Sequence, residues 1–267
     1  MVSLAPATTK GRLSAALSRV LAPVPPDRRA RRFAQLVVGL VGYGVTASML
    51  VLANLGLDPW DVFHQGLSRT FGLGIGTWAV IASVLVLVCG WIPLHQRPGV
   101  GTVMNAVMVG FVMDAILATV HPPHVLWARI ALLVGGVIGN GFATGFYIGA
   151  GLGPGPRDGL STGIAGRGYS MRVVRTTIEG SVLVTGFLLG GKIGVGTLLY
   201  ATTIGPITHV TIPALAIGRR RGTGVPAAQG VPVAHEEDHE AHDAREAPGG
   251  PDAPAPTREP ARVTQNL

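Results

Sequence analysis

Six long apolar segments fill the middle of the chain and predict membrane-spanning helices. They cover residues 33–53, 75–93, 99–120, 130–150, 174–190 and 193–217. Each segment is close to the roughly 20 helical residues that a bilayer core of about 30 Å requires. Because the connections between them are short, we predict an all-α membrane protein with about six transmembrane helices in one bundle, spanning residues 33–218.

The two ends of the chain differ from this apolar middle. Residues 1–32 are rich in Ala, Arg and Ser and poor in acids, so they form either a basic segment on an anionic membrane surface or a disordered leader. Residues 219–267 contain mostly Pro, Ala, Gly, His and acidic residues, which is the composition of a disordered tail.

Composition argues against a water-soluble protein. Hydrophobic residues make up 48% of the chain and charged residues only 13%, whereas soluble domains carry about 25% charged residues. The net charge of +7 does not indicate a nucleic-acid partner, because the basic residues lie at the ends of the apolar segments. They cluster on one side of the predicted bundle, which predicts that both termini are cytoplasmic.

The middle of the chain contains an internal repeat. A shift of 97 positions superimposes nine residues, and a shift of 95 superimposes the two Gly-Val-Gly-Thr segments at 99–102 and 194–197. The repeats cover about 33–121 and 130–218, with three predicted spans in each. An odd number of spans per repeat predicts a 3+3 inverted-topology arrangement. The residues matched by the first shift are Gly39, Gly42, Gly44, Ala53, Leu55, Gly56, Pro59, Asp61 and Gly66 with Gly136, Gly139, Gly141, Ala150, Leu152, Gly153, Pro156, Asp158 and Gly163.

The repeated motifs resemble a known family. The segment LGLDPWDVFHQGLS, its second copy GLGPGPRDGLSTG and the paired Gly-Val-Gly-Thr segments are similar to the YczE/YitT-type family of bacterial integral membrane proteins. The resemblance covers about residues 31–217 and implies a multi-pass protein of the bacterial cytoplasmic membrane. It implies no substrate or catalytic residue, because the family is largely uncharacterised.

The two Pro-Asp loops are the main candidate for a ligand site. Asp58-Pro59 and Gly155-Pro156 each fit an N-cap followed by proline in the first helical turn, so we expect a short half-helix after the first and the fourth spans. Interrupted segments at matching places in two repeats are typical of transporter sites. The candidate ligand-binding residues here are Pro59, Trp60, Asp61, Pro156, Arg157 and Asp158.

Each of these residues also has a simpler interpretation. Asp61 and Asp158 would offset helix dipoles in interfacial loops. Trp60 would anchor the chain at the membrane interface, and Arg157 would act only as a cytoplasmic topology signal.

Three further polar residues lie inside predicted spans. Glu179 is either a proton or cation site or the partner of Arg175, one helical turn before it. Asp114 aligns with His209 in the repeat, which suggests a proton relay. In an inverted repeat, however, the two residues would differ in depth by roughly 15 Å and could not touch.

The sequence predicts no enzyme, cofactor or metal centre. His235 and His239 fit the His-Glu-x-x-His pattern of zinc proteases, but the acidic, proline-flanked tail offers no apolar face for a packed helix. Cys89 is the single cysteine, so no intramolecular disulfide can form.

Two functions remain open at this stage. The first is a transporter or permease-like protein that moves a small molecule or ion through a site between the repeats. The second is a membrane accessory or scaffold protein that supports another enzyme through its loops and tails. The lipid bilayer is the expected environment, and glycine-lined faces would permit a homo-oligomer.

Overall fold

The computed structural model describes residues 21–94 and 98–218, which lie within one compact unit of the chain, Met1–Pro226. The predictions for residues 1–20 and 219–267, including the protease-like motif of the tail, fall outside the described residues.

Within the described residues the regular secondary structure is helical, as predicted. Each of the six apolar segments forms a helix, and a short helix follows the first and the fourth of them. The elements are α2 (Arg29–Ala53), α3 (Pro59–Phe71), α4 (Ile75–Leu94), α5 (Val100–Thr119), α6 (Leu126–Gly149), α7 (Pro156–Ala165), α8 (Met171–Leu188) and α9 (Val195–Leu215).

Fewer helices than predicted meet the requirements of a membrane span by themselves. Four do so by length and apolarity: α2, α5, α6 and α9. A fifth span results if α3 and α4 count as one segment, bent by 113° at a short break. α8 falls short because its 18 residues include Arg172, Arg175 and Glu179. The described chain is therefore an all-helical protein with four to five candidate spans, rather than the six that we predicted.

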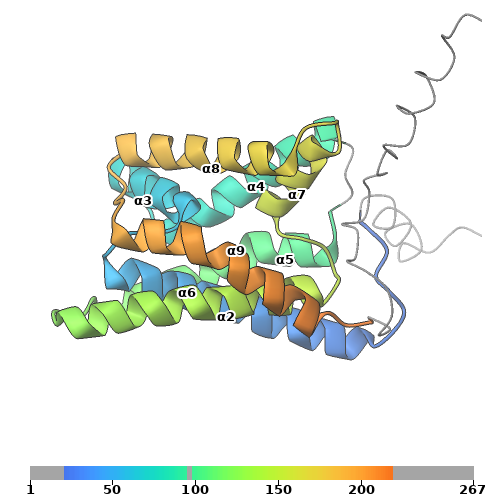
Figure 1. Cartoon of the computed structure of the whole chain (residues 1–267), viewed down its shortest axis with the longest axis horizontal. Coiled ribbons are helices and arrows are strands. Elements are labelled where there is room, and N and C mark those ends of the chain that lie inside the picture. Colours follow the sequence, from blue (N-terminus) through green and yellow to red (C-terminus); the bar gives the residue numbers. More distant parts are fainter. Residues whose placement is uncertain (1–20, 95–97, 219–267) are drawn as a thin grey trace, which may run out of the picture. The chain divides into compact units, whose positions relative to one another are not determined.

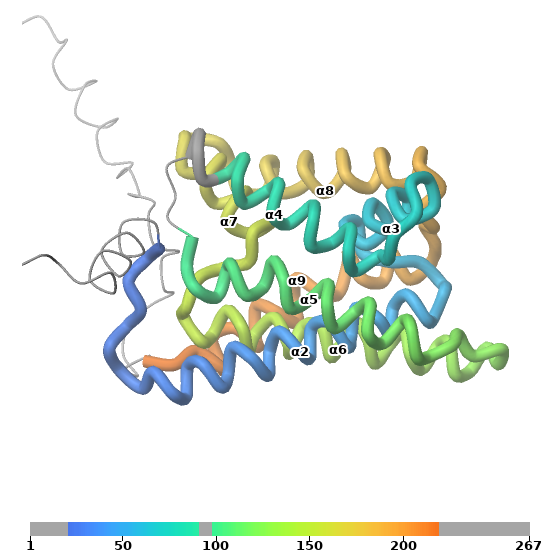
Figure 2. The backbone as a smooth tube through the Cα atoms, turned by 180° about the vertical axis from the view of Figure 1, so that it is seen from behind, coloured from blue at the N-terminus to red at the C-terminus, as the bar shows by residue number. Residues whose placement is uncertain are grey.

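The helices form two groups that share one strong connection (Figures 1 and 2). α2 packs antiparallel against α6 in the centre of the first group, with α5 on α2 and α9 on α6. In the second group α3 packs on α8 and α4 packs on α7. α4 and α5 join the two groups, whereas α8 and α9 make at most marginal contact.

The apolar core lies on both sides of the α2–α6 pair. One cluster joins α2, α5 and α6 through side chains that include Leu36, Leu40 and Met113. The other joins α2, α6 and α9 through side chains that include Leu50, Val137 and Tyr200, and it also takes in Val62 of α3. The first long helix of each repeat is therefore buried in the centre of the first group.

Residues related by the repeat make matching backbone contacts between its two copies. The Gly101 amide donates to the Leu152 carbonyl at 2.8 Å, and the Gly196 amide donates to the Leu55 carbonyl at 2.9 Å. Each contact joins the loop after the long helix of one repeat to the start of the last helix of the other. The exchange ties each copy to its counterpart.

Two arginines, 97 positions apart, exchange contacts in the same way. Arg32 Nη1 donates to the Ala150 carbonyl at 2.7 Å, and Arg129 Nε donates to the Ala53 carbonyl at 2.8 Å. These carbonyls end α6 and α2, where intrahelical partners run out. Arg32 also donates to the exposed Asp27 carboxylate, and this hydrogen bond holds the pKa of Asp27 below its usual value.

Glycines allow these close approaches. Gly56 and Gly153 have φ of +119° and +117°, a region that side-chain-bearing residues rarely adopt. A Cβ on Gly99 would overlap the Leu152 carbonyl oxygen, and one on Gly194 would overlap the Leu55 carbonyl oxygen. These four glycines, which the repeat preserves in pairs, lie where the two copies touch.

Candidate functional site

The N-terminus of α3 carries a buried aspartate at its cap. Asp58 Oδ1 accepts hydrogen bonds from the backbone amides of Trp60 at 2.8 Å and Asp61 at 3.0 Å. Pro59 occupies the first helical position, as predicted, because its fixed φ suits a helix start and its missing N–H needs no partner there. Asp58 is 1% exposed, and its second carboxylate oxygen has no hydrogen-bond partner among the described residues.

One turn further along α3 lies a buried aspartate–histidine pair. The distance from His64 Nδ1 to Asp61 Oδ1 is 3.2 Å, and both residues are 1% exposed. Asp61 Oδ2 and His64 Nε2 lack hydrogen-bond partners within the part of the chain that the structure describes. Since most buried polar atoms in proteins are hydrogen-bonded, three such atoms in two turns of one helix require an explanation.

Arg157 of α7 reaches this aspartate cluster from the other repeat. Its Nη1 lies 3.8 Å from Asp58 Oδ1, and its Cζ lies 5.2 Å from the centre of the Trp60 ring. The first distance is too long for a hydrogen bond and leaves a loose ion pair. Trp60 and Arg157 occupy the same repeat position, so the stacked pair joins the starts of α3 and α7.

The second repeat supplies a less buried acid, Asp158. Its Oδ2 accepts a hydrogen bond from the Tyr147 hydroxyl at 2.9 Å. The Tyr147 ring meets that of Tyr43 edge-on, with 6.0 Å between the centroids. Tyr200 of α9 donates to the buried Asn140 Oδ1 at 3.0 Å. Tyrosine hydroxyls and an asparagine therefore lie beside the charged groups, in helices of both repeats.

We use the name central cluster for the residues around the starts of α3 and α7. It contains six of the candidate positions from the sequence, since Pro59, Trp60, Asp61, Pro156, Arg157 and Asp158 all belong to these two helix starts. The remaining members are Asp58, His64, Tyr43, Tyr147, Asn140 and Tyr200.

The other three candidates lie apart from the central cluster. Asp114 accepts from the Gly76 amide at 2.7 Å and the Thr77 hydroxyl at 2.6 Å, so it caps the start of α4. His209 is exposed on α9 and has no described bond to Asp114. The structure therefore gives no support to a relay between them.

Glu179 forms the ion pair with Arg175 that was one of its two interpretations. Arg175 Nε donates to Glu179 Oε1 at 2.8 Å, and both side chains are substantially exposed, at 57% and 38%. The pair is an i,i+4 ion pair on the surface of α8, of the kind that stabilises a helix only slightly.

Sequence reasoning missed several members of the central cluster. His64 has no counterpart histidine in the second repeat, where Ser161 takes its place, so a search for shared residues passed over it. Its spacing of three residues from Asp61 was the available signal, because such pairs share a helix face. Asp58 was treated only as a cap.

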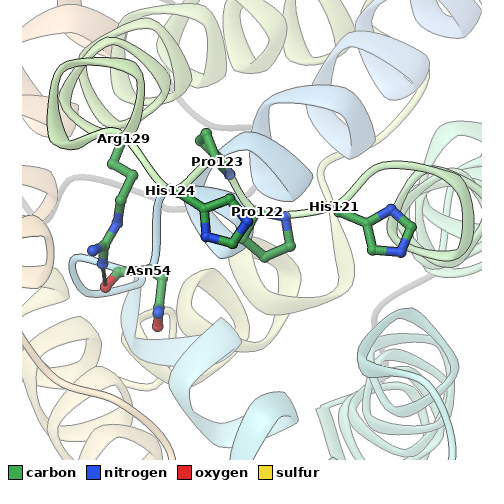
Figure 3. A pocket seen from close by; sticks show the side chains of 6 residues that line it. All are labelled: Asn54, His121, Pro122, Pro123, His124 and Arg129. Carbon is green, nitrogen blue, oxygen red and sulfur yellow. Dashed lines mark hydrogen bonds between the residues drawn. The ribbon is translucent and has the colours of Figure 1, made fainter.

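The pocket in Figure 3 lies elsewhere, at the connection between α5 and α6. Its volume is about 400 Å³, and it is lined by Asn54, His121, Pro122, Pro123, His124 and Arg129. Arg129 is already engaged with the Ala53 and Asn54 carbonyls, at 2.8 and 2.6 Å. The described residues contain no group of three or more His, Cys, Asp or Glu suited to hold a metal ion.

Comparison with known proteins gives a consistent family and no activity. Residues 30–213 match the model described as "Family of unknown function (DUF6198)". The chain is 36% identical over 182 residues to an uncharacterised protein of Haemophilus influenzae, covering 68% of this chain and 83% of that one. It is 34% identical over 184 residues to the uncharacterised membrane protein YczE of Bacillus subtilis, with the same coverage of 68% and 83%.

The same comparisons settle the resemblance noted in the sequence. No solved structure matches the chain. The match with the YczE protein and the apolar helices identify a membrane protein. The chain belongs to the DUF6198 family and is a relative of the YczE membrane protein.

Proposed function

We propose that the protein is a secondary transporter whose substrate site is the central cluster. The observation that carries the proposal is the set of three buried, unpartnered polar atoms: Asp58 Oδ2, Asp61 Oδ2 and His64 Nε2. Leaving such atoms unpaired costs about 1–3 kcal/mol each, and more when they are charged. A protein keeps this cost at a site where a ligand or proton completes the bonding.

A 3+3 inverted repeat with six membrane crossings is part of this proposal. The exchanged contacts of Arg32 and Arg129, and of Gly101 and Gly196, are those expected of a pseudo-twofold axis. α3 and α7 lie toward opposite ends of the second helix group, while Arg157 and Asp58 bring their starts together (Figure 1). Broken helices that meet near mid-membrane are a recurring feature of transporter sites.

We further propose that both termini face the cytoplasm in the bacterial cytoplasmic membrane. The connections before α2, after α4, after α7 and after α9, each of which contains at least one arginine, then lie on the cytoplasmic side. α8 crosses the membrane in this arrangement, with its charged residues toward its cytoplasmic half.

A thermal-stability screen of the purified protein against a library of metabolites and ions tests the site. A ligand at about 100 times its dissociation constant adds roughly 2.7 kcal/mol to the free energy of unfolding. We expect at least one compound to stabilise the native protein but neither Asp61→Asn nor Asp158→Asn. Glu179→Gln is the matched control, because it neutralises an exposed acid outside the central cluster. Flux of that compound in liposomes then tests transport.

The opposite result favours the accessory function. If every stabilising compound acts equally on the native protein and both variants, the central cluster is not the substrate site. If no compound acts while the variants fold normally, deletion of residues 219–267 or of the segment before Arg28 becomes the decisive comparison. Loss of a partner from such deletions would indicate a scaffold.

A further inference from the structure

The three unpartnered atoms of the central cluster share one chemical property. Asp58 Oδ2 and Asp61 Oδ2 are carboxylate oxygens, which accept hydrogen bonds. The tautomer of His64 follows from its neighbour: since Asp61 Oδ1 only accepts, His64 Nδ1 carries the proton of a neutral ring. His64 Nε2 is then a lone-pair acceptor as well. With Asp58 and Asp61 ionised, all three atoms require a hydrogen-bond donor.

The charges of the central cluster point in the same direction. Asp58 and Asp61 both face the guanidinium of Arg157. That guanidinium lies over the Trp60 ring and 3.8 Å from Asp58 Oδ1, so it leaves Asp58 Oδ2 unsatisfied. An anion would add to the excess of carboxyl groups.

Arg157 thus occupies a place suited to a cation from outside. An aromatic face beside a carboxylate is a general means of binding organic cations. The Arg157 side chain is 23% exposed, whereas Asp58 and Asp61 are almost completely buried. Its loose pairing and partial exposure allow it to leave, while the acids remain in place on α3.

We propose that the substrate of the central cluster carries a guanidinium or primary ammonium group, which replaces Arg157 on the Trp60 face and donates hydrogen bonds to Asp58 and Asp61. This inference rests on the proposed transport function and specifies its substrate class. Cations without N–H groups would match the charge but leave the acceptors unpaired.

Calorimetric titration of the purified protein with three small cations at equal ionic strength tests the inference. Methylguanidinium and methylammonium carry N–H donors, whereas tetramethylammonium carries none. We expect the first two to bind at least about tenfold more tightly than the third, which corresponds to about 1.4 kcal/mol. Asp61→Asn should weaken methylguanidinium binding by a similar factor.

The Arg157→Gln variant shows whether Arg157 competes with the substrate for the acids or contacts the bound substrate. If Arg157 competes with the substrate, its removal should tighten methylguanidinium binding by about tenfold or more, because the competent state becomes more populated. Arg172→Gln, the same change at an exposed arginine of α8, should leave the affinity unchanged. Size-exclusion profiles and melting temperatures establish that each variant is folded.

Four results would overturn the inference, and they separate it from the proposed function. Loss of methylguanidinium binding in Arg157→Gln would mean that Arg157 is part of the binding site and not a competitor for it. If neither methylguanidinium nor methylammonium binds, but the library screen finds a ligand of another class whose binding depends on Asp61, the substrate class is refuted and the site is retained. The substrate class is also refuted if the cations do not bind and the proton is the only ligand. In that case the stability of the protein would change with pH in a way that depends on Asp61. Absence of any Asp61-dependent ligand would refute the site as well.

Discussion

The two short helices of the repeat have the same backbone role and different chemistry. α3 and α7 both begin with proline and both place an aspartate in the first turn. The cap of α3 is the buried Asp58, whereas that of α7 is Gly155, which has no side chain to accept from the helix. α3 adds His64, and α7 has Ser161 in its place, whose hydroxyl donates to its own helix at the Arg157 carbonyl. The repeat therefore preserves the geometry, while the buried side-chain atoms without a partner in residues 21–94 and 98–218 all belong to the first copy.

The last helices of the repeats show a second difference. Asp114 of α5 caps the start of α4, and Gly110 lies against the Gly76 carbonyl. At the equivalent place on α9, His209 is exposed and Gly205 has open space around it. α4 and α5 are therefore joined by direct contacts at these positions, whereas α8 and α9 make at most marginal contact. Under the proposed inverted-repeat transport function, alternating access between the two sides requires such asymmetry.

Replacing the paired glycines with alanine should have the largest effect. The Cβ of Gly99→Ala or Gly194→Ala would overlap a carbonyl oxygen of the other repeat. We expect each to destabilise the protein by about 3 kcal/mol or more, with loss of monodisperse protein in detergent. Gly205→Ala is the control, because its surroundings are open and helical alanine is favoured over glycine by about 0.5–1 kcal/mol. Markedly unequal effects at positions 99 and 194 would argue against the equivalence of the two contacts.

Asp114→Ala should have an intermediate effect, and His209→Ala almost none. Removing Asp114 leaves the Gly76 amide and the Thr77 hydroxyl without their shared acceptor, at a cost of about 1–3 kcal/mol. His209 is exposed, so we expect its loss to change the free energy of unfolding by less than about 0.5 kcal/mol. Thermal melts in detergent measure both. If Asp114→Ala and His209→Ala destabilise the protein equally, His209 must be packed at an α8–α9 contact in the state that is populated most.

Glu179→Gln should have the smallest effect on stability. Its ion pair with Arg175 is exposed, and such pairs contribute at most about 0.5 kcal/mol. We expect a melting temperature close to that of the native protein and an unchanged response to any stabilising ligand. A loss of ligand response in this variant would move the site toward α8.

Much of the fold followed from the sequence because local signals determine it. Apolar runs of about 20 residues marked all six long helices to within a few residues, and the Asp-Pro and Gly-Pro pairs marked the starts of α3 and α7. The charged residues of α8 were visible in the sequence, but its apolar residues were given more weight in predicting the spans. The number of helices that meet the requirements of a membrane span by themselves was therefore overestimated.

The central cluster was harder to predict because it depends on packing between distant segments. The bond between Tyr147 and Asp158, and the position of Arg157 over Trp60, follow from how α3 and α7 meet. Arg32 and Arg129 were interpreted only as topology signals, although the shift of 97 that revealed the repeat also superimposes them. Comparing polar residues as well as glycines at that shift would have found the exchanged contacts.

Access to the central cluster from each side of the membrane tests the central claim most directly. Asn105 lies beside Gly155 at the start of α7, and Cys89 is the single native cysteine, so Asn105→Cys in a Cys89→Ser background gives one reporter. Phe71→Cys, at the exposed end of α3, and Tyr169→Cys, in the exposed connection between α7 and α8, serve as controls that should label from opposite sides. In liposomes, a membrane-impermeant thiol reagent should reach position 105 from both sides, because the proposed transport cycle opens the site to each side in turn. Labelling of position 105 from one side alone, with correctly labelled controls, would contradict transport through the central cluster.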